Sequence, residues 1–189
     1  TLGIPGADGR VKPEELLAAV RADTALVWAM QVNNETGAVL DVEALAAGVK
    51  QKNRRTAFHV DGVQGFCKIL SVSLEKTQID SYAVSGHKLH APKGVGALYL
   101  RRGMHILPPF VGGGQEGGMR PGTENTAYIA GFAAAVELAQ KNSKKWAENT
   151  RKLQGLLLDG LQKIPELVFN SPADAYEGIV NFSLPKVRS

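Results

Sequence analysis

Residues 79–88 read IDSYAVSGHK, a short apolar strand that runs directly into a polar turn holding a glycine, a histidine and a lysine. The apolar runs at 25–31 and 56–60 also have strand length, and polar side chains follow each of them. Helical patterns alternate with these strands, which is typical of an α/β fold with a mostly parallel sheet flanked by helices. Such sheets bind ligands beyond the carboxyl ends of their strands, so the polar clusters mark a candidate site.

Two helices are expected in the first half of the chain. The segment 13–22 has Pro13 in its first turn and apolar residues at helical spacing. Asp41 is expected to cap a second helix that runs to about Lys52. One face of that helix is apolar and should be buried, namely Val42, Leu45, Ala46 and Val49.

The second half of the chain is expected to hold two consecutive helices, at 124–141 with Thr123 as its cap and at 143–163. Further short strands are expected at 97–101, 168–170 and 179–183. The transition between the two helices suggests a domain boundary. We therefore expect part of one large domain at 1–142, and a linking helix with the start of a smaller C-terminal domain at 143–189.

The composition excludes several classes of protein. The 189 residues carry 22 Lys and Arg against 18 Asp and Glu, a net charge of +4, and the basic residues are scattered, so we expect no nucleic-acid surface. The longest apolar run, 127–138, contains Glu137 and is shorter than the ~20 residues that cross a bilayer, so we expect no membrane span. The single cysteine, Cys67, excludes a disulfide framework and a cysteine-rich zinc site.

The turn Ser85-Gly86-His87-Lys88 is a candidate reactive site. A lysine at a strand end becomes nucleophilic when burial or a neighbouring cation lowers its pKa, as in enzymes that form Schiff bases. Ser85 and His87 can donate hydrogen bonds to a phosphate. The alternative is an ordinary exposed loop lysine beside a locally packed histidine, and these four residues alone do not decide between the two.

A second candidate is Asp61, which follows the strand 56–60, with Gln64 three residues farther on. A buried carboxylate is costly unless it is paired, so a protonated pyridine nitrogen would be a natural partner for it. Gln64 could reach the same ligand. The plainer interpretation is that Asp61 caps a helix.

Glycine accounts for 21 of the 189 residues, above the usual share of about 7%, and several glycines lie within 112–122. Three of them match the G-x-G-x-x-G spacing, but Pro121 interrupts any helix there and no acidic residue follows at a strand end, which argues against dinucleotide binding. We interpret the segment as a mobile loop whose end, Thr123, offers a phosphate a hydroxyl and a helix N-terminus. The four histidines lack the carboxylate or cysteine partners of a metal site.

Several motifs follow one another along nearly the whole chain: Val32-Asn33-Asn34-Glu35-Thr36-Gly37, His59-Val60-Asp61 with Gln64, Ser85-Gly86-His87-Lys88, Pro92-Lys93-Gly94-Val95-Gly96-Ala97-Leu98-Tyr99, and Gly112-Gly113-Gly114-Gln115-Glu116 with Arg120 and Gly122-Thr123-Glu124-Asn125. Together they resemble the cysteine desulfurases and selenocysteine lyases of the class V aminotransferase family. The resemblance implies the fold type I architecture built around pyridoxal 5'-phosphate (PLP), a three-layer αβα large domain.

The resemblance also implies a role for the residues around the ring of the cofactor. Lys88 would form the internal aldimine with PLP and is the expected catalytic residue. Asp61 would pair with the pyridine nitrogen and hold it protonated. Gln64 and Asn34 would contact the ring oxygen or the substrate. In the family reaction, PLP activates L-cysteine, a catalytic cysteine takes the sulfur as a persulfide, and alanine leaves.

The phosphate end of the cofactor is assigned in the same way. Ser85 and His87 would bind the phosphate, and Thr123 would reach the phosphate of the neighbouring subunit's cofactor, because the family forms homodimers with shared sites. The parent protein would be a cytoplasmic sulfur donor for iron–sulfur clusters or thiolated cofactors, with a sulfur-acceptor or scaffold protein as its partner.

Departures from the family pattern limit what we expect of the chain itself. It stops at Ser189, before the loop expected to carry the catalytic cysteine, and Cys67 is not that cysteine. The chain is therefore expected to be a central fragment that is inactive alone. Two alternatives stay open: another class V PLP enzyme, such as an aminotransferase or a selenocysteine lyase, and a non-catalytic fragment that dimerises.

Overall fold

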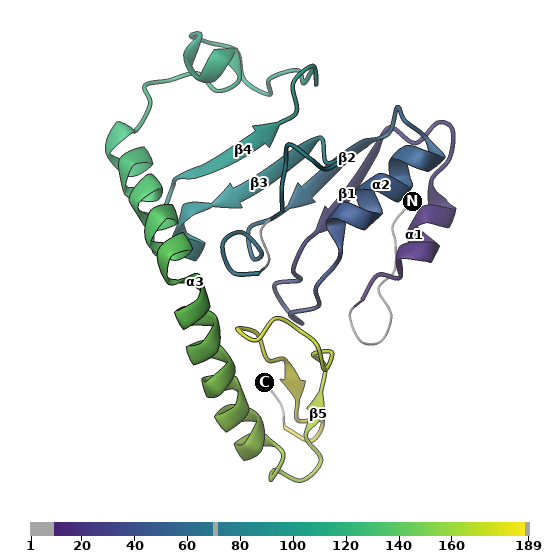
Figure 1. Ribbon diagram of the computed structural model, residues 1–189, viewed down its shortest axis with the longest axis vertical. Coiled ribbons are helices and arrows are strands. Elements are labelled where there is room, and N and C mark those ends of the chain that lie inside the picture. The colour runs from purple at the N-terminus through teal and green to yellow at the C-terminus, as the bar shows by residue number, and fades with distance from the viewer. Residues whose placement is uncertain (1–9, 70–71, 188–189) are drawn as a thin grey trace.

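The computed structural model describes residues 10–69 and 72–187 (Figure 1). At its centre lies a four-stranded sheet with the strand order β1-β2-β3-β4. The strands are β1 (Leu26–Met30), β2 (Ala57–Asp61), β3 (Ser81–Ser85) and β4 (Gly96–Leu100). The first three run parallel and β4 pairs antiparallel with β3. The expected α/β fold with a mostly parallel sheet is thus confirmed.

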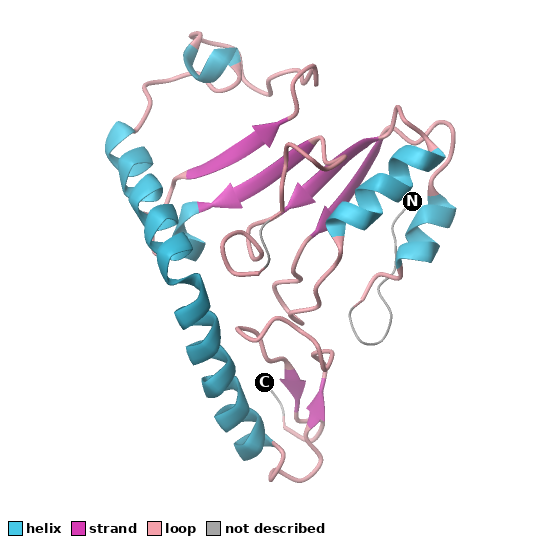
Figure 2. Cartoon of the chain, viewed as in Figure 1, coloured by secondary structure: helices cyan, strands magenta, loops and turns pink. Residues whose placement is uncertain are grey.

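Helix α2 (Val42–Lys52) packs on one face of the sheet, and α1 (Pro13–Ala19) packs beside it (Figure 2). The side chain of Asp41 accepts a hydrogen bond from the amide of Ala44 at 3.0 Å, which confirms it as the N-cap. The four apolar residues predicted to share a face are all buried against the sheet: Val42, Leu45, Ala46 and Val49.

The other long helix differs from the prediction. Helix α3 runs without a break over Thr126–Leu161, and its N-cap is Asn125, whose side chain accepts from the amide of Tyr128 at 3.2 Å. The expected cap at Thr123 and the expected pair of helices are therefore wrong. The polar residues near the supposed break bond back into the helix, since Asn142 donates to the carbonyl of Leu138 and Ser143 to that of Gln140. The helix crosses the expected boundary at 142–143, and the division into two domains stays a prediction.

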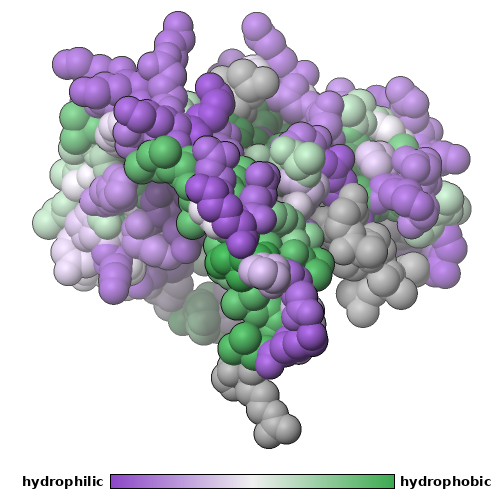
Figure 3. All heavy atoms as spheres, turned by 90° about the horizontal axis from the view of Figure 1, so that it is seen from below, coloured by the Kyte–Doolittle hydropathy of each residue, from purple (hydrophilic) through white to green (hydrophobic). Residues whose placement is uncertain are grey.

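After α3, a small antiparallel sheet is formed by β5 (Val168–Phe169) and β6 (Phe182–Ser183). Apolar side chains gather on the face seen from below in Figure 3. Exposed apolar residues in the second half of α3 and in this segment include Leu153, Leu156, Leu157 and Val168. The described residues also form two short 3-10 helices, η1 (Gly86–Leu89) and η2 (Gln115–Gly118). In the part of the chain that the structure describes, no helix is long and apolar enough to span a membrane.

The strands of the sheet alternate between a buried and an exposed face. Phe58 and Val60 of β2 point into the core shared with α2. On the opposite face, Trp28 of β1 is 65% exposed and Leu98 of β4 is 52% exposed. The same alternation directs His59 and Asp61 away from the core under α2.

Candidate functional site

The polar clusters meet at one edge of the sheet. Since β1, β2 and β3 are parallel, their carboxyl ends lie together, and each leads into a polar turn. Backbone hydrogen bonds continue the ladder past the strand ends, from the amide of Gln31 to the carbonyl of Asp61 and from the amide of Gly62 to the carbonyl of Ala83, both at 2.9 Å. The turn 33–37, the segment 61–64 and the start of η1 are therefore held side by side.

Lys88 lines a cavity of about 250 Å³ between η1 and α3. Cys67 and Lys68 from the segment after β2 form another wall, and Trp146 of α3 and Tyr176 line it too. Leu89 of η1 packs against α3 in a small apolar cluster, which fixes this part of the chain. Lys88 is half-buried, so its amine lies in a partly enclosed space rather than on an open loop.

Asp61 lies at the end of β2 and is half-buried. Among the described residues, its carboxylate accepts one hydrogen bond, from the amide of Val63 to Oδ1 at 3.0 Å. The residues that follow form a turn and not a helix, so the interpretation of Asp61 as a helix cap does not hold. Most of the acceptor capacity of the carboxylate is left for a ligand.

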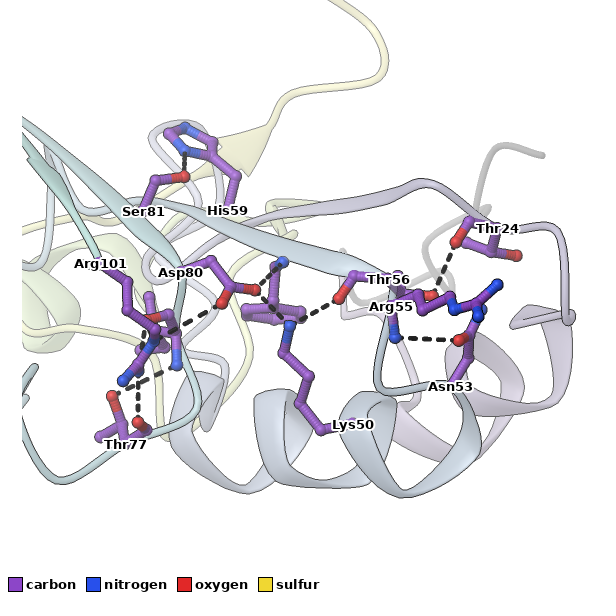
Figure 4. A network of polar contacts seen from close by, with 12 residues as sticks. Thr24, Lys50, Asn53, Arg55, Thr56, His59, Thr77, Asp80, Ser81 and Arg101 are labelled. Carbon is purple, nitrogen blue, oxygen red and sulfur yellow. Dashed lines mark hydrogen bonds and ion pairs between the residues drawn. The ribbon is translucent and has the colours of Figure 1, made fainter. Parts of the chain in front are cut away.

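His59 is placed two residues before Asp61 on the same face of β2. Its Nδ1 atom lies 2.7 Å from Oγ of Ser81 on the neighbouring strand (Figure 4). Burial lowers the pKa of His59, against a smaller raising effect of the Asp61 carboxylate. The neutral imidazole is therefore favoured beside the candidate site.

Lys68 lines the cavity beside Lys88, and the sequence interpretation missed it. Its Nζ atom donates to Oε1 of Gln64 at 2.9 Å. Burial lowers the pKa of Lys68, and the positive charge of Lys88 lowers it further. In the sequence, only the spacing of four residues between Gln64 and Lys68 hints at this contact. That spacing predicts a contact in a helix but not in a turn.

The turn after Asp61 rests on a buried pair of polar side chains, Tyr82 and Gln31. The hydroxyl of Tyr82 donates to Oε1 of Gln31 at 2.5 Å, and burial raises the pKa of that hydroxyl. A Cβ atom at Gly62 would collide with the ring of Tyr82, and one at Gly65 would collide with the side chain of Gln31. The glycines therefore let the backbone of the turn approach this pair closely.

Ser85 and His87 form a local pair at the start of η1. Oγ of Ser85 and Nδ1 of His87 lie 2.7 Å apart, and His87 is exposed. Asn34 is also exposed, and its side chain donates to Oε1 of Glu35 at 2.9 Å. The backbone of that turn is organised by the neighbouring Asn33, whose side-chain oxygen accepts from two amides.

Thr123 stands apart from the other candidates. It is exposed and it precedes α3, far along the chain from the ends of β1, β2 and β3. Of the seven predicted residues, Lys88 alone lines the cavity. The segment 102–122 before it extends beyond the sheet (Figure 1). That segment exposes large apolar side chains, among them Leu107, Phe110 and Val111. Asp61 and Ser85 are thus the last residues of β2 and β3, and Asn34, Gln64, His87 and Lys88 follow strand ends at the same edge of the sheet, whereas Thr123 does not.

Known proteins resemble this chain in sequence. Residues 4–189 match the family described as aminotransferase class-V. "Cysteine desulfurase 2" of Trichormus variabilis is 46% identical over 153 residues, which is 79% of this chain and 38% of that protein. "Cysteine desulfurase IscS" of Clostridium botulinum is 38% identical over 180 residues, 93% of this chain and 45% of that protein.

Solved structures of similar proteins superpose on this chain over nearly its whole length. A "NIFS-LIKE PROTEIN" superposes with a TM-score of 0.93 at 39% identity, over 100% of this chain and 51% of that one. DndA from Streptomyces lividans superposes with a TM-score of 0.89 at 36% identity, over 98% of this chain and 52% of that one. The chain spans less than half the length of the two curated relatives.

Proposed function

The chain belongs to the class V aminotransferase family, and on that basis we propose that the protein to which it contributes is a PLP-dependent cysteine desulfurase. The reaction would remove sulfur from L-cysteine to give alanine and a persulfide. The observation that carries the proposal is the half-buried Lys88 beside a cavity, at the sheet edge where Asp61 ends the neighbouring strand. Relatives that carry the name cysteine desulfurase support the choice of reaction.

The residues at this edge suit PLP as the cofactor. The amine of Lys88 would hold its aldehyde carbon, and the free acceptor capacity of Asp61 suits a pyridinium N–H. The Ser85 and His87 pair offers donors for a phosphate. When bound, PLP supplies a protonated ring that withdraws electrons and so stabilises negative charge on the carbon next to an amino group.

The protein's own groups then have distinct tasks. The Asp61 carboxylate would keep a proton on the ring nitrogen, because an anion in a half-buried site favours the cationic form of its partner. The amine of Lys88 would take up and return a proton when it is not bonded to the cofactor. Gln64 and Asn34 would orient the ring oxygen or the substrate by hydrogen bonds.

Cys67 lines the cavity but is unsuited to accept the sulfur. It is half-buried, and burial raises the pKa of its thiol. The thiolate is the reactive form of cysteine, so this thiol is a poor nucleophile at neutral pH. We therefore assign the sulfur-accepting cysteine to a part of the protein outside this chain.

The proposed protein is a homodimer with shared sites. The exposed side chains of Leu107, Phe110 and Val111 form an apolar surface of the kind that packs against another subunit. Thr123, which follows this segment, would then bind the cofactor phosphate of the second subunit. The family resemblance also leads us to propose a cytoplasmic protein that passes its sulfur to an acceptor or scaffold protein.

The test is a titration of the purified protein with PLP, followed by borohydride reduction and peptide mass mapping. The expected result is a pyridoxyl adduct on Lys88 that disappears in Lys88→Ala. Lys93→Ala is the matched control, since Lys93 is an exposed lysine five residues away. An adduct on another lysine that persists in Lys88→Ala would reject the site, and an adduct at Lys88 without alanine release by the complete dimer would reject the desulfurase activity.

A further inference from the structure

Lys68 and Gln64 form a fixed pair in the segment after β2. The ammonium group of Lys68 donates to Oε1 of Gln64 at 2.9 Å. An ammonium group can only donate, so the atom of the Gln64 amide that faces it must be the oxygen. The NH2 group of Gln64, which also can only donate, is therefore turned away from Lys68.

Lys68, one member of this pair, lies near the candidate reactive lysine. Lys68 is half-buried and lines the same cavity as Lys88. Gln64 lies three residues after Asp61, in a turn whose backbone is closed by hydrogen bonds from the amides of Gly65 and Phe66 to the carbonyl of Gly62. The orientation of the Gln64 amide is thus set within a hydrogen-bonded turn at the edge where the cofactor would bind.

We propose that Lys68 is a positioning residue, which holds the amide of Gln64 so that its NH2 group is presented to an acceptor oxygen of the bound cofactor. The inference rests on the proposed function, because it takes PLP as the ligand. The deprotonated ring hydroxyl of PLP is an acceptor of this kind. Without Lys68 the amide can rotate and present its own oxygen, which would repel that acceptor.

The effect of the hydrogen bond from Lys68 to Gln64 must be distinguished from the effect of the positive charge of Lys68. The positive charge of Lys68 acts on Lys88 through space whatever residue stands at position 64, whereas the hydrogen bond acts only through Gln64. A double-mutant cycle separates the two effects. The other titratable groups around the pair stay the same in every variant: Asp61, Cys67, Tyr82, His90 and Tyr176.

The experiment measures the pH at which the absorbance of PLP bound to Lys88 changes, in the wild type, Lys68→Met, Gln64→Leu and the double variant. We expect Lys68→Met to raise this midpoint by about one pH unit, equivalent to about 1.4 kcal/mol. The reason is that the ring oxygen of the cofactor would lose the hydrogen bond from the NH2 group of Gln64. In the Gln64→Leu background the same substitution should shift the midpoint by much less. Lys68→Arg keeps a donor and should restore the wild-type midpoint.

Each result supports or overturns the proposal. Equal shifts in both backgrounds would show that Lys68 acts by charge alone and would overturn it. Gln64→Leu removes the amide without changing the charge of the protein. An unchanged midpoint in that single variant would therefore also overturn the proposal, even if Lys68→Met failed to fold. Lys76→Met removes an exposed lysine and should change nothing. Failure of the wild type to bind PLP at Lys88 would instead reject the proposed function.

Discussion

Replacement of Asp80 by alanine should destabilise the sheet that carries the candidate site. Oδ2 of Asp80 accepts from Nζ of Lys50 at 2.5 Å and from the backbone amide of Phe58 at 2.8 Å (Figure 4). Oδ1 lies 3.5 Å from Nε of Arg101. One carboxylate thus links α2, the strand β2 and the end of β4.

The expected loss follows from burial. The side chains of Asp80 and Lys50 are 13% and 17% exposed, and removing one partner of a buried ion pair costs about 3–5 kcal/mol. Lys50 would keep one bond, to the carbonyl of Thr56 at 2.7 Å, while the amide of Phe58 would lose its acceptor. Arg101 retains bonds to the carbonyls of Thr77 and Ile79. We expect a loss of about 3 kcal/mol, a large share of the usual ~5–15 kcal/mol of a folded domain.

The assay is urea unfolding followed by circular dichroism, with Asp80→Ala compared with the wild type. Asp23→Ala is the matched control, because Asp23 forms an exposed ion pair with Arg21 and should leave the midpoint unchanged. The combined variant Lys50→Met with Asp80→Leu should be more stable than Asp80→Ala, since no charge is left unpaired. A loss below about 1 kcal/mol for Asp80→Ala would refute the assigned strength of this network.

Three further predictions concern the site and α3. Gly62→Ala should cost about 1–3 kcal/mol, because its methyl group meets the ring of Tyr82, and adding Tyr82→Leu should restore part of the loss in urea unfolding. Asn125→Ala should cost about 1 kcal/mol by removing the N-cap of α3, whereas Thr123→Ala should leave the urea midpoint unchanged. Burial lowers the pKa of His59, so below its ordinary value of about 6.5 the unfolded chain binds more protons than the folded one, and the free energy of unfolding should fall as the pH falls. A fall of the same size in His59→Gln would contradict that assignment.

Helix α2 shows how much local sequence can predict. Its N-cap and its four buried residues are confirmed because both signals lie within one short segment. The cap needs only a carboxylate three residues before an amide, and the buried face needs only helical spacing. No knowledge of the rest of the chain enters either inference.

The direction of β4 could have been predicted from the length of the loop that precedes it. Strand β4 was predicted within one residue of its observed position, yet its antiparallel pairing with β3 was not predicted. The connection from Ser85 to Gly96 is short, and a parallel crossover needs about a dozen residues or more. The loop length alone therefore favoured an antiparallel edge strand.

The support beneath the site could not be predicted from local pattern. Tyr82 and Gln31 are 51 positions apart in the sequence, and Lys50 and Asp80 are 30 apart. Each side chain alone is compatible with many partners, and only the packing of β1, β2 and β3 brings these together. The strand ends could be read from the sequence because apolar runs stop there, whereas the contacts that hold them depend on the whole sheet.

Strand β2 contributes side chains both to the apolar core and to the candidate site. Phe58 and Val60 are fully buried against α2, and the alternation of side chains places His59 and Asp61 on the opposite face. A register slip of one residue would turn the Asp61 carboxylate into the apolar core and expose Phe58. The bond from the Phe58 amide to Asp80 therefore does more than stabilise the sheet. It helps to fix the register that directs Asp61 to the candidate site, so a variant that weakens this bond should lose cofactor affinity as well as stability.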